Sequence, residues 1–205
     1  MDNEAHATQL TPYKEVLFRR LRALVPTRSA LVVELGIGLF VNAPYYEYWE
    51  DLQVVGIEPD TNKHSQAEAS AAASGVRLRM HSCRAEQLPL AENSADAVVS
   101  TYALCTIDDP RQALAEVKRV LKADGVFAFL EHVRSETDEC LAARQTEATP
   151  EELRCWGCHL DRRTLQHIEA AAFSRVIGAV GDQCYHEVPT ESTLMSPTVV
   201  GFAFP

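Results

Sequence analysis

Short apolar runs alternate with helical patterns along this chain, and no other feature of the sequence constrains the fold as strongly. The runs with the length and composition of buried strands are 30–35, 54–57, 76–80, 95–100, 125–130, 175–180 and 198–204. The helical patterns are 11–24, 62–74, 110–121 and 164–172. Strands connected through helices form a mostly parallel sheet with helices on both faces. A polar loop joins the last two runs, which predicts an antiparallel hairpin at one edge.

A pair of glycines, Gly36 and Gly38, follows the first apolar run. Glycines let the chain turn sharply and bring backbone groups against a ligand. Glu58 lies about twenty residues further on, at the end of the second run, where a carboxylate can accept hydrogen bonds from both hydroxyls of a ribose. Ligands of open α/β sheets bind beyond the carboxyl ends of the strands. Together these residues predict a site for a nucleoside-containing cofactor.

Phe40 and Val41 stand where a dinucleotide-binding loop would have its third glycine and the start of a tight helix. Bulky side chains at these positions would obstruct a pyrophosphate. The Gly-Lys-Ser/Thr sequence of a phosphate-binding loop is also absent. The loop therefore favours a cofactor that carries no phosphate.

Five segments resemble the motifs of class I S-adenosylmethionine-dependent methyltransferases. They are ELGIG (34–38), GIEPD (56–60), RAEQLP (84–89), SADAVVSTYALC (94–105) and EVKRVLKADG (116–125). Four further segments are similar to the small alkyl thiol S-methyltransferases. They are ALC (103–105), FLEHV (129–133), GCHL (157–160) and AAFS (171–174).

The resemblance implies a Rossmann-like fold with a mostly parallel seven-stranded sheet and an antiparallel C-terminal edge hairpin. It also implies S-adenosyl-L-methionine as the cofactor and S-adenosyl-L-homocysteine as the product. By the same resemblance, Gly36 and Gly38 would pass under the methionine part of the cofactor, and Glu34 would orient its amino end. Thr101 and Leu104 would line the pocket of the methyl donor.

The nucleoside end of the cofactor is assigned in the same way. The resemblance implies that Glu58 holds the ribose hydroxyls and that Pro59 contacts the adenine. Ala85 and Glu86 would border the adenine ring and its amino group. Phe40 replaces the third glycine of the family motif, so the backbone path of the glycine loop could differ from that of the family. The polar start of the chain, residues 1–4, does not match the apolar N-terminal membrane segment of the thiol methyltransferases.

His132 and His159 are the candidate catalytic residues. A thiol acceptor with a pKa of about 8.5 needs only modest help to lose its proton. His132 follows the fifth strand and His159 lies in the Gly-Cys-His segment, so either imidazole could remove that proton. The alternative for each is a structural or surface histidine. Tyr102 and Asp108 are the second choices.

The cysteines and aromatic residues have simpler interpretations. Cys155 and Cys158 have the spacing of half a zinc site or of a redox pair. Because no second Cys/His pair at suitable spacing completes the site, we expect no metal and interpret these cysteines as pocket or core thiols. The aromatic residues of segment 45–49 are expected to pack in the core, although a substrate wall is the alternative.

The composition limits the classes of partner. A chain of 205 residues, 46% hydrophobic and 23% charged, predicts one domain over 1–205. The net charge of −10 and the lack of a basic stripe argue against nucleic acid. No apolar run approaches the ~18–20 residues that span a bilayer, and residues 1–4 are too acidic for a signal peptide. We therefore expect a cytoplasmic protein without stable membrane insertion; the oligomeric state is not predicted.

Two segments are expected to enclose the site. Residues 1–28 would form an N-terminal cap helix, and the least patterned segment, 135–157, would form a lid or substrate segment that excludes water. The resulting hypothesis is methyl transfer to a small molecule, with a thiol or hydrosulfide as the acceptor. The alternatives are an O-, N- or C-methyltransferase acting on a quinone or natural-product precursor, and a cofactor-binding regulatory protein that has lost catalysis.

Overall fold

A computed structural model describes residues 3–25, 29–47, 49–180, 184–187, 193–195 and 197–205. Its strands are β1 (Leu31–Leu35), β2 (Gln53–Ile57), β3 (Arg77–His81), β4 (Ala95–Thr101), β5 (Leu121–His132), β6 (Arg175–Gly178), β7 (Tyr185–Glu187) and β8 (Pro197–Phe204). Its α-helices are α1 (Asn3–Leu24), α2 (His64–Ala73), α3 (Pro110–Val120), α4 (Glu139–Trp156) and α5 (Thr164–Ala170). Short 3-10 turns are η1 (Ala43–Tyr46), η2 (Thr61–Lys63) and η3 (Thr193–Met195).

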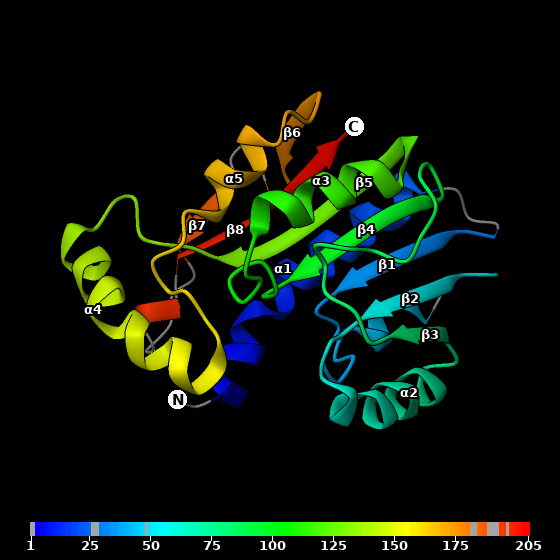
Figure 1. Ribbon diagram of the computed structural model, residues 1–205, viewed down its shortest axis with the longest axis horizontal. Coiled ribbons are helices and arrows are strands. Elements are labelled where there is room, and N and C mark those ends of the chain that lie inside the picture. Colours follow the sequence, from blue (N-terminus) through cyan, green and yellow to red (C-terminus); the bar gives the residue numbers. More distant parts are fainter. Residues whose placement is uncertain (1–2, 26–28, 48, 181–183, 188–192, 196) are drawn as a thin grey trace.

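The strands form one mixed sheet in the order β3-β2-β1-β4-β5-β8-β6 (Figure 1). The pairs β1–β2, β1–β4, β2–β3 and β4–β5 are parallel. Strand β8 is antiparallel to both β5 and β6. The seven predicted strands and the antiparallel pair near the C-terminus are confirmed. Strand β7, which pairs with β8, was not predicted.

Helices cover both faces of the sheet, as predicted. On one face, α1, η1 and α2 pack on side chains from β1, β2, β4, β5 and β8. On the other face, α3 and α5 pack on the side chains that point the opposite way along the same strands. Figure 1 shows α1 crossing behind the strands and α3 in front of them. The sheet is therefore buried on both faces, which explains why its strands read as continuous apolar runs.

Helix α1 is an integral part of this core. The pattern of segment 11–24 predicted its second half, and the structure extends it back to Asn3. Leu17, Phe18 and Leu21 are buried against the sheet, and the Arg20 guanidinium donates hydrogen bonds to the carbonyls of Gly178 and Ala179. These contacts anchor the second half of the helix to the sheet.

Segment 135–157, expected to be a lid or substrate segment, contains an 18-residue helix, α4. Asp138 caps its start by accepting a hydrogen bond from the Leu141 N–H, and Gly157 ends it in the left-handed conformation with φ 70°. Figure 1 shows α4 standing beside the sheet rather than lying on either face. Trp156, its last residue, lines a cavity together with residues that follow β1, β2 and β4.

No helix in the described ranges has both the length and the apolar character that crossing a membrane requires.

Candidate active site

The carboxyl ends of β1, β2 and β4 meet at a cavity of about 410 Å³. Figure 1 shows the arrowheads of these three strands pointing to the same side of the molecule. Six of the nine predicted cofactor residues line the cavity: Gly36, Gly38, Glu58, Pro59, Ala85 and Glu86. A cavity of this size lies within the usual range for small-ligand sites.

The glycine loop turns through conformations that favour glycine. Gly36 and Gly38 have φ of +56° and +55°, and a Cβ on Gly36 would lie 2.7 Å from the Cβ of Ala103. The loop after β1 therefore packs directly against the loop after β4. This close contact leaves bare backbone facing the cavity.

Phe40 does not obstruct the cavity, so the prediction that its side chain would block a pyrophosphate is wrong. Its backbone adopts the left-handed conformation with φ 56°, and its side chain is fully buried in the core, where its ring centroid lies 5.8 Å from that of Tyr46. The ring thus points away from the ligand side of the loop. A phenylalanine here costs about 1–2 kcal/mol of backbone strain, which burial of its ring offsets.

Glu58 joins the end of β2 to the glycine loop. Its carboxylate accepts hydrogen bonds from the N–H groups of Gly38 and Asp60, each at 3.0 Å, and lies 3.5 Å from the Lys63 ammonium. The residue is only 5% exposed, yet it lines the cavity. A negative charge is therefore held at the position where the sequence predicts the ribose.

Glu34 lies beneath the loop and is not among the residues that line the cavity. Its carboxylate accepts hydrogen bonds from the Asn42 amide and the Tyr46 hydroxyl, both at 2.8 Å, and burial raises its pKa to about 7. The Asn42 amide also donates to the Thr101 hydroxyl at 2.8 Å, and Lys14 donates to Asn42 at 2.9 Å. Glu34 and Thr101 thus support the glycine loop through their hydrogen bonds to Asn42. Asn42 was missed by sequence reasoning.

The loop after β4 supplies different residues from those predicted. Leu104 is fully buried in the core on the α3 face, whereas Tyr102, Ala103 and Thr106 line the cavity. Trp156, at the end of α4, also lines it and is 72% exposed. Trp156 lies in segment 135–157, where a lid or substrate segment was expected, although Trp156 itself was not singled out.

The adenine side of the predicted site is fixed by α3. Glu86 accepts a hydrogen bond from the Asp109 N–H at 3.1 Å, and the Gln112 amide donates to the Glu86 carbonyl at 3.4 Å. Asp108, a second-choice candidate, forms an exposed ion pair with Arg84. Both partners of that pair line the same cavity.

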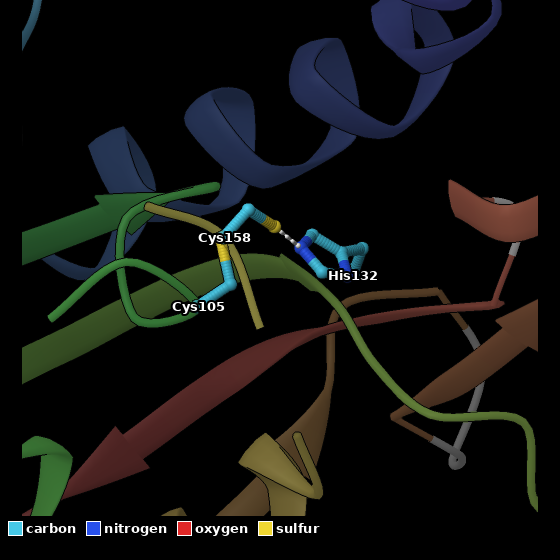
Figure 2. A group of neighbouring side chains, drawn as sticks. All are labelled: Cys105, His132 and Cys158. Atoms are coloured by element: carbon cyan, nitrogen blue, oxygen red, sulfur yellow. Dashed lines mark hydrogen bonds between the residues drawn. The ribbon is translucent and has the colours of Figure 1, made fainter. Parts of the chain in front are cut away.

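His132 is fully buried and does not line the cavity. Its Nε2 lies 2.9 Å from the Sγ of Cys158, with Cys105 beside them (Figure 2). The Cys105 thiol and the imidazole lower the pKa of Cys158 to about 5, whereas the hydrogen bond to Cys158 and burial raise the pKa of Cys105. Cys155 is exposed and donates a hydrogen bond to Glu151 at 3.3 Å instead. Cys158 is therefore a core thiol, as interpreted from the sequence, whereas that interpretation is wrong for Cys155.

The structure places His159 apart from His132. Its side chain lines a separate hollow with Arg134, Arg162 and His167, and burial lowers its pKa. The two candidate bases therefore face different surroundings, and neither lines the cavity at the ends of β1, β2 and β4.

Comparison with known proteins identifies the family. The methyltransferase domain model matches residues 33–129. Thiol S-methyltransferase TMT1B of Rattus norvegicus is 33% identical over 178 residues, which cover 80% of this chain and 68% of the relative. This chain belongs to the S-adenosylmethionine-dependent methyltransferases. Thiol S-methyltransferase TMT1A of Homo sapiens is 29% identical over 210 residues, covering 95% of this methyltransferase and 79% of the relative.

Solved structures agree with the class I methyltransferase fold. The [4+2]-cyclase SpnF superposes with a TM-score of 0.68 at 16% identity and covers 93% of this chain and 80% of its own. A SAM-dependent methyltransferase from Aquifex aeolicus superposes with a TM-score of 0.61 at 18% identity, covering 90% and 87%. At these identities the likeness concerns the fold alone.

S-adenosylmethionine is the cofactor of this methyltransferase, and the cavity fits it. The bare backbone at Gly36, where a Cβ would meet Ala103, gives a close cradle. The acidic Glu58 at the end of β2 suits a ribose. When bound, the cofactor supplies an electrophilic methyl group.

Proposed function

We propose that this methyltransferase transfers the methyl group to the sulfur of a small thiol or hydrosulfide. The observation that carries the proposal is the extent of the similarity to the thiol S-methyltransferases. It covers 80% of this chain, whereas the methyltransferase domain model matches residues 33–129 only. The similarity therefore extends beyond the part of the chain that forms the predicted cofactor site.

The chemistry of a thiol acceptor makes small demands on the protein. A thiol with a pKa of about 8.5 is a few per cent thiolate at neutral pH, and the thiolate is a strong nucleophile. The protein must hold the sulfur in line with the methyl group and keep water away. Positioning, rather than a strong base, is then the main contribution of this chain.

Tyr102, Ala103, Thr106 and Trp156 are proposed to hold the acceptor. They lie on the side of the cavity formed by the loop after β4 and the end of α4. The Tyr102 hydroxyl is 3.1 Å from the Thr198 hydroxyl, so its ring is fixed in place. Trp156 gives segment 135–157 a contact with the cavity, which supports the proposal that this segment covers the acceptor.

The cofactor roles follow the lining residues. Gly36 and Gly38 would pass under the methionine part, Glu58 would hold the ribose, and Pro59, Ala85 and Glu86 would border the adenine. Glu34, Thr101 and Leu104 would act by supporting the loops. Neither His132 nor His159 lines the cavity. Proton removal by either imidazole therefore stays a prediction.

The test is the release of S-adenosylhomocysteine with acceptors matched in shape but different in nucleophile. Thiophenol, phenol and aniline share one ring, and sulfide tests the smallest acceptor. We expect turnover with thiophenol and sulfide, rising with pH up to the pKa of each thiol. Turnover with phenol or aniline at equal or greater efficiency would contradict the thiol proposal.

Calorimetry with S-adenosylmethionine separates this enzyme from a binding protein that has lost catalysis. Binding together with thiol turnover supports the proposal. Binding without turnover on the whole panel would favour the regulatory alternative. Failure to bind S-adenosylmethionine would contradict the assignment of the cavity as the cofactor site.

A further inference from the structure

Three side chains that no predicted role connects converge beside the cavity. Cys105 comes from the loop after β4, His132 is the last residue of β5, and Cys158 follows α4. The imidazole and the Cys158 thiol are 2.9 Å apart, and the ligand atoms of all three residues lie within 4.8 Å of one another. Figure 2 shows the three side chains pointing toward one another from separate segments.

We infer that Cys105, His132 and Cys158 bind a thiophilic divalent cation of the zinc class. Zinc binds thiolate at about 2.3 Å and imidazole at about 2.0–2.1 Å in tetrahedral geometry. Two such ligands of one ion lie about 3.5–3.8 Å apart. Small side-chain rotations would therefore close the present cluster around one ion. Thiolate and imidazole ligands select zinc over magnesium or calcium, which prefer oxygen.

The surroundings leave the cluster poorly satisfied without a cation. Both thiols pack with Leu160 in an apolar group that also contacts Leu194 and Met195. His132 is fully buried, and its Nδ1 has no hydrogen-bond partner among the residues that the structure describes. Its Nε2 has a thiol as partner, and a thiol is a weak donor and acceptor. A cation bound by the two thiolates and Nε2 would replace these weak thiol contacts with metal–ligand bonds.

The backbone that carries the ligands is already fixed. The His159 N–H donates to the Cys105 carbonyl at 3.0 Å. The Arg162 guanidinium donates to the carbonyls of Leu104 and Ile107 at 2.5 and 2.6 Å. These bonds join the segment after α4 to the loop after β4 independently of any ion. The two cysteines are thus positioned for a ligand before it binds.

The site adjoins the proposed acceptor wall. Ala103 and Thr106, on either side of Cys105, line the cavity, and so does Trp156, two residues before Cys158. The ring of Tyr102, another lining residue, lies with its centroid 5.6 Å from that of His132. A bound ion would therefore cross-link the two segments that form this wall and tie them to the end of β5. Three protein ligands also leave one of the four tetrahedral positions open.

Cobalt(II) is the probe for the test, since it takes the place of zinc and gives visible absorption in tetrahedral thiolate sites. The whole chain, reduced and treated with a chelator, is titrated with cobalt and then with zinc. We expect one cobalt per chain, a thiolate-to-cobalt absorption band, and displacement by one zinc. Cys105→Ser, Cys158→Ser and His132→Gln should each weaken zinc binding at least 100-fold. The matched control is Cys155→Ser, which alters an exposed cysteine of the same segment and should keep full affinity.

A second measurement covers the case in which the variants do not fold. In the wild-type protein, zinc should slow the alkylation of the buried Cys105 and Cys158 relative to the zinc-free protein, as read by mass spectrometry over time, while Cys155 and Cys140 react equally fast with and without zinc. Binding that is lost in Cys155→Ser, or protection of the exposed cysteines only, would mean an adventitious surface site and would overturn the inference. So would the absence of stoichiometric cobalt binding. None of these readouts uses an acceptor or the cofactor, so failure here leaves the proposed methyl transfer standing.

Discussion

The carboxylate of Glu58 accepts a hydrogen bond from the Gly38 N–H at 3.0 Å across 20 residues of sequence. The same group accepts a bond from the Asp60 N–H. One buried side chain therefore fixes the ends of β1 and β2 relative to each other at the cavity. Its charge stabilises the glycine loop and is also available for the proposed hydrogen bonds to the ribose.

Glu58→Gln keeps the shape of this side chain but removes its charge. It also replaces one of the two acceptor oxygens by an NH2 group, which donates hydrogen bonds. We expect the affinity for S-adenosylmethionine, measured by calorimetry, to fall about 10- to 100-fold, because charge-assisted hydrogen bonds are worth about 1.5–3 kcal/mol. The control is Glu68→Gln on the exposed face of α2. Equal affinities in the two variants would show that Glu58 does not hold the cofactor.

Gly36→Ala should be far more damaging than Gly75→Ala. Both residues have positive φ, +56° and +66°, so each substitution costs about 1–2 kcal/mol of backbone strain. Only at Gly36 would the new Cβ also meet another side chain, at 2.7 Å from the Cβ of Ala103, whereas nothing lies within 4 Å at Gly75. Urea unfolding of both variants measures the difference. Similar losses of stability would contradict the close packing of the two loops.

Trp156→Ala should weaken acceptor binding and leave the fold intact. The side chain is 72% exposed and lines the cavity, so its removal takes away a contact surface without opening the core. We expect KM for thiophenol to rise several-fold with little change in kcat, and stability to change by less than about 0.5 kcal/mol. Leu153→Ala, on the same helix and 36% exposed, is the control. An unchanged KM, or an equal effect of both substitutions, would remove Trp156 from the acceptor site.

Glu34 should make stability fall as the pH rises. Its pKa in the folded protein is about 7, against an ordinary value of 4.5, because burial disfavours the charge. The folded state therefore holds the proton more tightly than the unfolded state. The contribution of this group is fully present below about pH 4.5 and is lost as the pH passes 7. Urea unfolding between pH 4.5 and 8 should follow this sign.

Glu34→Gln tests the same point directly. We expect the variant to be more stable than the wild type at pH 8, by about 1–3 kcal/mol, and to show a flatter dependence on pH. A slope in the same direction should remain, because burial also raises the pKa of Glu131 to about 7. A variant that is less stable at pH 8, with an unchanged slope, would show that Glu34 is not the group that titrates.

The strands were predictable because burial on both faces leaves a direct trace in the sequence. Helix α4 left no such trace, since its inner face is partly polar. The Gln145 side chain is fully buried, donates to the carbonyls of Val133 and Leu194, and accepts from the Ser135 N–H. A buried amide with satisfied hydrogen bonds replaces the apolar residue that a periodicity argument looks for. Asp138 and Gly157 cap the two ends of this helix in the structure, but no helix was predicted between them.

The part of the site that follows from the fold class alone could be predicted from the sequence. The glycine loop and Glu58 lie at the ends of adjacent strands, where the fold class alone brings them together. The cluster of Cys105, His132 and Cys158 depends on three segments that meet only in the folded molecule. Sequence spacing offered only Cys155 as a partner for Cys158, and that pairing was set aside, because spacing shows neighbours along the chain alone.

The place of β8 between β5 and β6 has a consequence for how the protein is made. Synthesis proceeds from the N-terminus, so the outer edge of β5 stays open until residues 197–204 have left the ribosome. Strands β1 to β4, which border the cofactor cavity, can pair while the nascent chain is still growing. While that edge is exposed it can pair wrongly with other chains, and β8 is the strand that closes it.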